Sequence, residues 1–280
     1  MVAGDFRFTP TRAGARVAVF KMIICADDYG LSDDVDRAIL ELCGAGRLSA
    51  VSCMVVLERC DSGTLKKLLA HQDQVDVGLH FCVADETLPG FPAYGPYLRR
   101  SLLGRISPHE IFLKVSAQYE TFLQKCGRRP DYIDGHLHAH QLPGVREGLI
   151  QFVQSLPANV RPYIRNTCEP LQNLRRLKLP WLKASFIGAF GKRMLADLRA
   201  AGLATNDGFA GIYDFRSWRK YPDYFPRFVA CLGARNGILV VHPGGREDWR
   251  RQEFETLRAF PFAPGAVQRF QKPAWRPEKI

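Results

Sequence analysis

The chain has 280 residues, of which 46% are hydrophobic and 24% are charged. These proportions are typical of a globular protein and exclude a collagen-like, coiled-coil or wholly disordered chain. The 39 basic residues exceed the 28 acidic ones, and the net charge of +11 favours anionic partners such as nucleic acid, acidic lipid headgroups or phosphorylated substrates. The basic residues are scattered and form no lysine-rich tail, so we expect no nucleic-acid site.

Apolar runs alternate along the chain with segments of helical periodicity. Residues 1–21 contain basic residues but no apolar signal-peptide core, and we expect them to form a flexible leader. The runs predicted to be strands cover residues 19–26, 51–56, 75–83, 131–137, 160–164, 183–187 and 237–242. The segments predicted to be helices cover residues 33–43, 64–70, 108–126, 145–155, 192–201 and 221–232. A long loop, over residues 84–106, follows the third strand.

Continuous apolar strands that alternate with helices indicate a parallel sheet covered on both faces. The six to seven strand–helix units favour an α/β fold of the irregular (β/α) barrel type, TIM-barrel-like, over an open sheet. We therefore treat residues 22–280 as a single barrel domain. The eight cysteines form no Cys-x-x-Cys pair, which predicts buried free thiols in a reducing, cytoplasmic compartment.

Polar residues gather where the predicted strands end, which is where parallel α/β folds place their active sites. Asp27 and Asp28 follow the first strand. Adjacent residues of a strand point to different sides, so one acid could bind a metal while its neighbour takes a proton; a helix cap or loop anchor is the alternative. Five of the seven histidines also fall at strand ends: His80, His136, His138, His140 and His242.

The densest of these clusters is Asp-Gly-His-Leu-His-Ala-His at 134–140. In a strand, residues i and i+2 share a face about 6.6 Å apart, so Asp134 and the three histidines are predicted to share one face. Histidine is a common ligand of divalent metals. The extended spacing predicts that one histidine binds the ion while the others support it or contact substrate.

One carboxylate and two histidines make a three-ligand metal site with positions open for water and substrate, which is the catalytic arrangement. Competing motifs are absent from the sequence. It contains no glycine-rich nucleotide cradle after a strand and no Gly-x-Ser-x-Gly elbow.

These residues lie in stretches that resemble the YdjC-like carbohydrate deacetylases, a family that includes chitooligosaccharide and hopanoid-pathway deacetylases. The resemblance runs from about residue 22 to residue 257. The matching stretches are Ala-Asp-Asp-Tyr-Gly-Leu-Ser at 26–32, Val-Gly-Leu-His at 77–80, Arg-Arg-Pro-Asp-Tyr-Ile-Asp-Gly-His-Leu-His-Ala-His at 128–140, Arg165 and Glu169, Thr-Asn-Asp at 205–207, and His-Pro-Gly at 242–244.

The resemblance implies a barrel-like enzyme that binds one divalent metal, with magnesium or zinc expected first, and removes acetyl groups from N-acetylated sugars. It implies that Asp28, His80 and His136 are the metal ligands. It further implies Asp27 as the general base and His242 as the general acid. The residues expected to contact substrate are Tyr29, His138, His140, Arg165, Asn206 and Asp207.

Two other functions remain open from the sequence. One is a metal-dependent hydrolase or isomerase of another sugar derivative on the same barrel. The other is a basic protein that binds an anionic surface. A mixed form would bring the enzyme to a lipid-linked sugar at an anionic membrane. The identity of the sugar, the formation of a homodimer and the role of the 84–106 loop are also open.

Overall fold

In a computed structural model of the chain, residues 21–169, 181–232 and 236–271 are described. Within them, seven parallel strands form one sheet in the order β5-β4-β3-β2-β1-β7-β6. The strands are β1 (Met22–Tyr29), β2 (Ala50–Cys53), β3 (Asp76–Phe81), β4 (Tyr132–Gly135), β5 (Tyr163–Ile164), β6 (Gly208–Ala210) and β7 (Gly237–Val241). Most strand positions are buried, as the continuous apolar runs predict.

The sheet curls until its two outer strands meet. Ile164 at the end of β5 forms a parallel bridge with Thr205, just before β6, and its amide donates to the Ala204 carbonyl at 2.9 Å. The Asn206 side chain reinforces this seam, because its Oδ1 accepts from the Asn166 amide at 2.8 Å and its Nδ2 donates to the Asn166 carbonyl at 2.9 Å. The predicted irregular (β/α) barrel is therefore confirmed.

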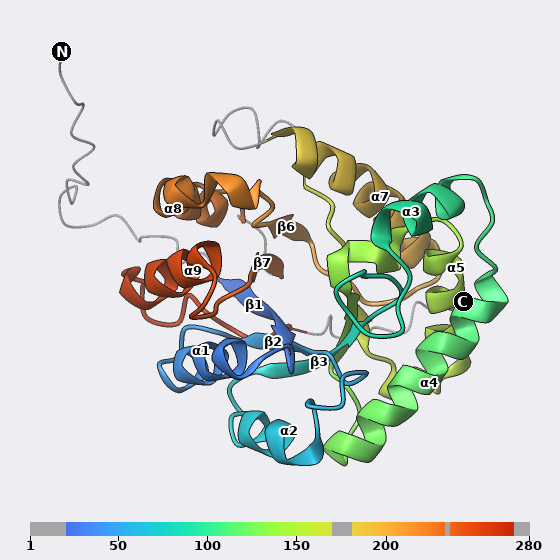
Figure 1. Cartoon of the computed structure of the whole chain (residues 1–280), viewed down its shortest axis with the longest axis horizontal. Coiled ribbons are helices and arrows are strands. Elements are labelled where there is room, and N and C mark those ends of the chain that lie inside the picture. The colour runs from blue at the N-terminus through green and yellow to red at the C-terminus, as the bar shows by residue number, and fades with distance from the viewer. Residues whose placement is uncertain (1–20, 170–180, 233–235, 272–280) are drawn as a thin grey trace, which may run out of the picture.

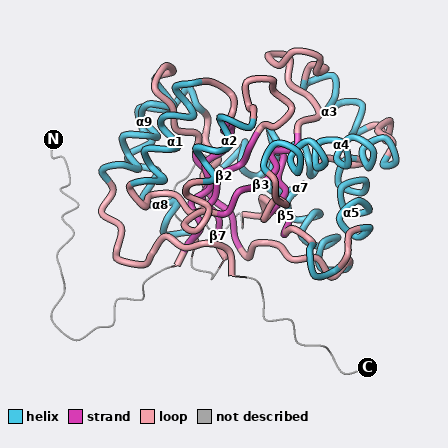
Figure 2. Tube along the Cα trace, turned by 90° about the horizontal axis from the view of Figure 1, so that it is seen from below, coloured by secondary structure: helices cyan, strands magenta, loops and turns pink. Residues whose placement is uncertain are grey.

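Helices surround the strands, which run through the centre of the molecule in both views (Figures 1 and 2). The α-helices are α1 (Asp33–Gly44), α2 (Ser62–Leu69), α3 (Tyr94–Leu102), α4 (Pro108–Cys126), α5 (Val145–Ser155), α7 (Trp181–Ala200), α8 (Tyr221–Cys231) and α9 (Asp248–Ala259). Short 3₁₀ turns are η1 (His136–Gln141), η2 (Ala158–Val160) and η3 (Phe215–Lys220). Over the described ranges, no helix combines the length and apolar character needed to cross a membrane.

Local sequence signals explain where several helices begin and end. Ser32 accepts a hydrogen bond from the Val35 amide and caps α1. Ser107 caps α4, which begins with Pro108, and Gly127 ends it at φ 66°. These boundaries match the predicted ones within a residue.

Other elements differ from the prediction. Residues 183–187, expected as a strand, lie within helix α7, because an apolar run this short does not distinguish the two structures. Its buried residues Ala184, Met194 and Leu198 follow helical spacing. Helix α3 lies inside the segment expected as a loop, and β6 and α9 were not predicted. The expected leader, except for Lys21, lies outside the described residues.

The core contains one close glycine–tyrosine contact and several buried cysteine thiols. Gly78 in β3 leaves room for the Tyr132 ring, since a Cβ at this position would lie 2.3 Å from a ring atom. None of the eight cysteines, all of which lie in the described residues, forms a disulfide; six are buried and two are half-buried, as the sequence predicts.

Candidate active site

The carboxyl ends of β1, β3, β4 and β7 open into a cavity of about 740 Å³. Side chains from four separate strand ends line it, which is the position that parallel α/β folds give to their sites. The predicted site residues among its lining are Asp27, Asp28, His80, His136, His138 and His242.

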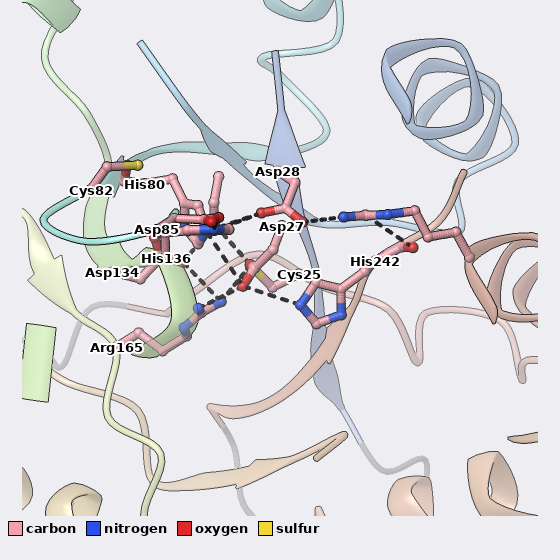
Figure 3. A network of polar contacts seen from close by, with 12 residues as sticks. Cys25, Asp27, Asp28, His80, Cys82, Asp85, Asp134, His136, Arg165 and His242 are labelled. Carbon is pink, nitrogen blue, oxygen red and sulfur yellow. Dashed lines mark hydrogen bonds and ion pairs between the residues drawn. The ribbon is translucent and has the colours of Figure 1, made fainter. Parts of the chain in front are cut away.

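A bulge in β1 brings both acidic residues to this cavity. The register of β1 against β2 shifts between Ala26 and Tyr29, and Asp28 lies in the left-handed region at φ 71°. This conformation costs roughly 1–2 kcal/mol for an L-residue, although Asp tolerates it better than most. The expectation that Asp27 and Asp28 point to different sides is therefore wrong: both line one cavity, with His80 and His136 on one side and His242 on the other (Figure 3).

Three potential metal ligands converge at Asp28. His136 Nδ1 lies 3.1 Å from Asp28 Oδ1, His80 Nε2 lies 3.4 Å from the same oxygen, and the two ring nitrogens are 3.4 Å apart. All three residues are buried. The structure thus brings together the three residues that the resemblance implied as ligands.

The outer partners of the two histidines determine which nitrogen faces inward. His80 Nδ1 donates to Asp134 Oδ1 at 2.7 Å, and His136 Nε2 donates to Asp85 Oδ2 at 2.7 Å. With these protons in place, His80 Nε2 and His136 Nδ1 direct lone pairs toward the carboxylate oxygen of Asp28. Three lone pairs that meet at one point need a cation between them, so the donor set fits a divalent metal.

The electrostatics of the site also call for a cation. Burial opposes charge on His80, but the Asp134 and Asp27 carboxylates and their hydrogen bonds raise its pKa to about 10. Burial likewise opposes charge on Asp28, and the Arg250 guanidinium, whose Nη2 lies 2.7 Å from Asp28 Oδ2, holds the pKa of this carboxyl well below its usual range. Without a metal the site attracts a proton, and a divalent ion would satisfy the same excess of negative charge.

A second cluster of possible ligands is formed by Cys25, Asp27 and Asp134. The positively charged guanidinium of Arg165 pairs with its two carboxylates and takes the place that a metal ion would fill. The fully buried Arg165 places Nη1 2.6 Å from Asp27 Oδ1 and 2.8 Å from Asp134 Oδ2, and Nη2 2.8 Å from Asp27 Oδ2. Burial would raise the pKa of Asp27, but Arg165, aided by His80 and His242, holds it well below its usual range. Asp27 is therefore ionised at neutral pH.

Asp27 lies between the metal site and the candidate acid. Its Oδ2 is 4.0 Å from His80 Nε2 and 4.0 Å from His242 Nε2. The His242 ring meets the edges of Phe215 and Trp249, with centroids 5.5 and 5.9 Å away. Burial in this apolar surround lowers the pKa of His242 to about 4.

The three histidines at 136–140 do not share a strand face, contrary to the prediction. β4 ends at Gly135, and Leu137 and His138 both take left-handed backbone angles, with φ of 53° and 55°. This turn directs His136 toward the metal site and His138 into the cavity lining. His140 is fully buried. Alternation along a strand could not predict this arrangement.

Three residues expected to contact substrate are fully buried and have other partners. The Tyr29 hydroxyl donates to the Thr64 carbonyl at 2.8 Å, and His140 Nε2 donates to the Arg165 carbonyl at 2.8 Å. The Arg165 guanidinium binds Asp27 and Asp134 as described. Since none of the three lines the cavity, we assign them to support of the site.

Two further expected contacts lie away from the cavity. Asn206 closes the barrel seam, and the exposed Asp207 precedes β6, at the amino edge of the sheet. His138 is the remaining predicted contact, and it does line the cavity, with its Nδ1 buried without a hydrogen-bond partner and its ring edge-on to Phe209.

Helix α9 contributes residues that the sequence did not reveal. Arg250 and Glu253 are buried, at 6% and 1% exposure, and Trp249 lines the cavity beside His242. Arg250, Glu253 and Leu257 form the buried face of this helix. Two of these three residues are charged, so the helix lacks the apolar periodicity by which helices are predicted from sequence. The helical spacing of positions 250, 253 and 257 was the available signal for this buried face.

Sequence similarity identifies the family of this chain. A family model described as "YdjC-like protein" matches residues 21–263. The chain belongs to the YdjC-like family. Its relatives include a chitooligosaccharide deacetylase from Escherichia fergusonii, 29% identical over 135 residues, or 44% of this chain and 52% of that protein. Another, from Yersinia pestis (strain Pestoides F), is 28% identical over 179 residues, or 60% of this chain and 69% of that protein.

The match thus spans about half the length of the first relative. Among solved structures, this YdjC-like chain resembles a putative cellobiose-phosphate cleavage protein from Enterococcus faecalis, with a TM-score of 0.60 and 17% identity. That similarity covers 86% of this chain and 91% of the other, and it supports the barrel fold.

Proposed function

We propose that this YdjC-like protein is a metal-dependent hydrolase that removes acetyl groups from an N-acetylated sugar or oligosaccharide. The observation that supports this most strongly is the convergence of Asp28, His80 and His136, which fits a metal, beside an ionised Asp27 and a cavity-facing His242. The relatives described above are chitooligosaccharide deacetylases, which points to the same substrate class.

Asp28, His80 and His136 would hold one divalent ion, with magnesium or zinc the first candidates. Such an ion lowers the pKa of a bound water and polarises an acetyl carbonyl. Asp134 and Asp85 fix the orientation of the two histidines through their 2.7 Å hydrogen bonds, which is the usual arrangement behind metal-binding histidines.

Two residues next to these ligands would move protons. Asp27, kept ionised by Arg165, accepts a proton from the attacking water through Oδ2. His242 Nε2, which lies 4.0 Å from Asp27 Oδ2, donates a proton to the nitrogen of the scissile amide. This protonation is needed because the nitrogen is a poor leaving group unless it departs as the neutral amine. His138, whose Nδ1 has no partner, would contact the sugar from the facing wall.

The test is acetate release from a panel of N-acetylated sugars, chitooligosaccharides and lipid-linked N-acetyl sugars. Acetate release from any of these compounds supports the proposal and identifies the substrate. Release from the lipid-linked N-acetyl sugars would show that the enzyme accepts a lipid-linked substrate. If a protein with one bound metal per chain releases no acetate from the whole panel, the proposal is wrong, and another sugar derivative becomes the substrate to seek.

The net charge of +11 motivates a separate test for peripheral contact with anionic membranes. Co-sedimentation with anionic vesicles at low and moderate salt measures it, and no binding at low salt removes that part of the proposal. Size-exclusion chromatography with light scattering tests the homodimer. A cytoplasmic location is retained as part of the proposal, since the free cysteines suit a reducing compartment.

A further inference from the structure

We infer that Glu253 stores the proton that His242 delivers to the leaving amine, so that the two residues act as a relay. The inference rests on the proposed deacetylation and deepens it. Glu253 does not reach the substrate cavity and acts through His242, which makes it a positioning residue.

The geometry of Glu253 supports this role. The residue is 1% exposed, and its carboxyl group lies directly behind His242. Oε2 accepts from the His242 amide at 2.5 Å and lies 3.9 Å from His242 Nδ1, while Oε1 accepts from the Tyr213 hydroxyl at 2.8 Å. The backbone contact fixes the carboxyl group to the same residue whose ring it faces.

The two ring nitrogens of His242 therefore face different partners. Nδ1 faces Glu253 Oε2 at 3.9 Å, and Nε2 faces Asp27 Oδ2 at 4.0 Å on the cavity side. A proton accepted at Nδ1 can thus be matched by one released at Nε2 toward the substrate. A displacement of about 1 Å, from a small rotation of the imidazole ring, brings Nδ1 within hydrogen-bond reach of the carboxyl group.

Neighbouring charges explain why the pair is needed. The charged and titratable groups that face the two residues come from β1, η1, the end of β5, the segment after β6, α8 and α9: Asp27, Asp28, His138, Arg165, Tyr213, Tyr221 and Arg250. Burial, with Arg250 and Arg165, lowers the pKa of His242 to about 4, so His242 alone is neutral at pH 7. Burial raises the pKa of Glu253 to about 7, so its carboxyl group can hold a proton near neutrality.

Before transfer, Glu253 is protonated and His242 is neutral with its proton on Nε2. The Nε2–H bond breaks as the amine nitrogen gains that proton, and Nδ1 takes the proton from Glu253 Oε2. The products are a neutral amine, a neutral His242 protonated on Nδ1, and a Glu253 carboxylate. The proton that Asp27 took from the attacking water then passes to His242 Nε2, 4.0 Å from Asp27 Oδ2, and Nδ1 returns its proton to Glu253, so all three residues regain their starting states.

The test compares Glu253→Gln with Glu255→Gln, a matched change on the same helix at a partly exposed residue paired with Arg258. Glutamine keeps an oxygen that can accept from the His242 amide but stores no proton. We expect Glu253→Gln to lower kcat for amide deacetylation at pH 7 by about 100-fold, the lower range for loss of a general acid. Metal content and KM should stay at the wild-type values, as they should in Glu255→Gln.

A second substrate separates proton delivery from general damage. 4-Nitrophenyl acetate has a leaving group that departs without protonation, so its hydrolysis should fall less than threefold in Glu253→Gln. Equal losses on the amide and the ester would contradict the relay. Wild-type kcat on the amide in Glu253→Gln would contradict it as well.

Tyr213→Phe gives an independent readout that does not depend on Glu253→Gln folding. The Tyr213 hydroxyl lowers the pKa of Glu253, so its removal should raise that pKa and move the alkaline limb of the kcat profile to higher pH. An unmoved limb would overturn the inference. Acetate release by the wild-type protein is measured first, because its absence would contradict the proposed function itself. If the wild-type protein releases acetate but Glu253→Gln and Tyr213→Phe behave as the wild type does, only the relay is contradicted.

Discussion

Replacing Arg165 with methionine should destabilise the protein strongly, because the buried guanidinium pairs with two buried carboxylates. Its nitrogens lie 2.6 and 2.8 Å from the oxygens of Asp27 and 2.8 Å from Asp134 Oδ2, and all three side chains are 2% exposed or less. Removing one partner of a buried pair costs about 3–5 kcal/mol, since the other charge stays buried and unpaired. For a domain of this size, each kcal/mol lowers Tm by about 2–4 °C, so Tm should fall by about 10 °C.

The assay is urea unfolding at pH 7 in the presence of chelator, followed by tryptophan fluorescence and circular dichroism. The control is Arg193→Met, which removes a 69% exposed arginine paired with Asp197 four residues along α7. That pair should contribute about 0.3–0.5 kcal/mol. If Arg165→Met unfolds within 1 kcal/mol of the wild type, as the control should, the buried pair does not hold the site as described.

The pH dependence provides a second check on the same pair. The folded pKa of Asp27 lies below its unfolded value of about 3.9, so the ion pair stabilises the fold above that value. This contribution disappears as pH falls through the folded pKa. The difference in unfolding free energy between wild type and Arg165→Met should therefore be largest near pH 7 and shrink below pH 4. A difference that is constant from pH 7 to pH 3 would contradict the assignment.

Three further substitutions test the ligands, the base and the core. His136→Ala should reduce bound metal, measured by mass spectrometry, from one ion per chain to below a tenth, while His109→Ala, exposed on α4, should keep it. Asp27→Asn should keep the metal but lose about 10²–10⁴-fold in kcat; retention of half the activity would exclude Asp27 as the base. Gly78→Ala should cost about 3 kcal/mol of unfolding free energy, because its Cβ would overlap the Tyr132 ring. Its control, Gly95→Ala, adds a Cβ with nothing within 4 Å and should stabilise α3 slightly in the same urea assay.

The sequence predicted the barrel and the strand ends because these depend on local patterns. Buried parallel strands read as apolar runs, and Asp28, His80 and His136 follow or end such runs. Their convergence follows from topology alone, since the carboxyl ends of parallel strands meet at one edge. Topology thus predicts a polar cluster at the strand ends, whereas the choice of these three residues as metal ligands depends on the resemblance to the YdjC-like family.

The rest depends on three-dimensional packing. The bulge that turns Asp27 and Asp28 into one cavity is a backbone irregularity that apolar alternation does not record. Arg165 resembled a residue that contacts substrate, because an arginine near an active site gives no sign of being buried until its carboxylate partners are located. Glu253 was hidden on a helix whose inner face carries charges, so the usual hydrophobic signal was missing.

The most direct test of the central claim is acetate release from a chitooligosaccharide, measured on one preparation before chelation, after removal of the metal, and after stoichiometric add-back. We predict that acetate release stops on chelation and returns when one divalent ion per chain is restored. Release that continues unchanged in protein shown to contain no metal would contradict the assignment of Asp28, His80 and His136 as the metal ligands of a deacetylase.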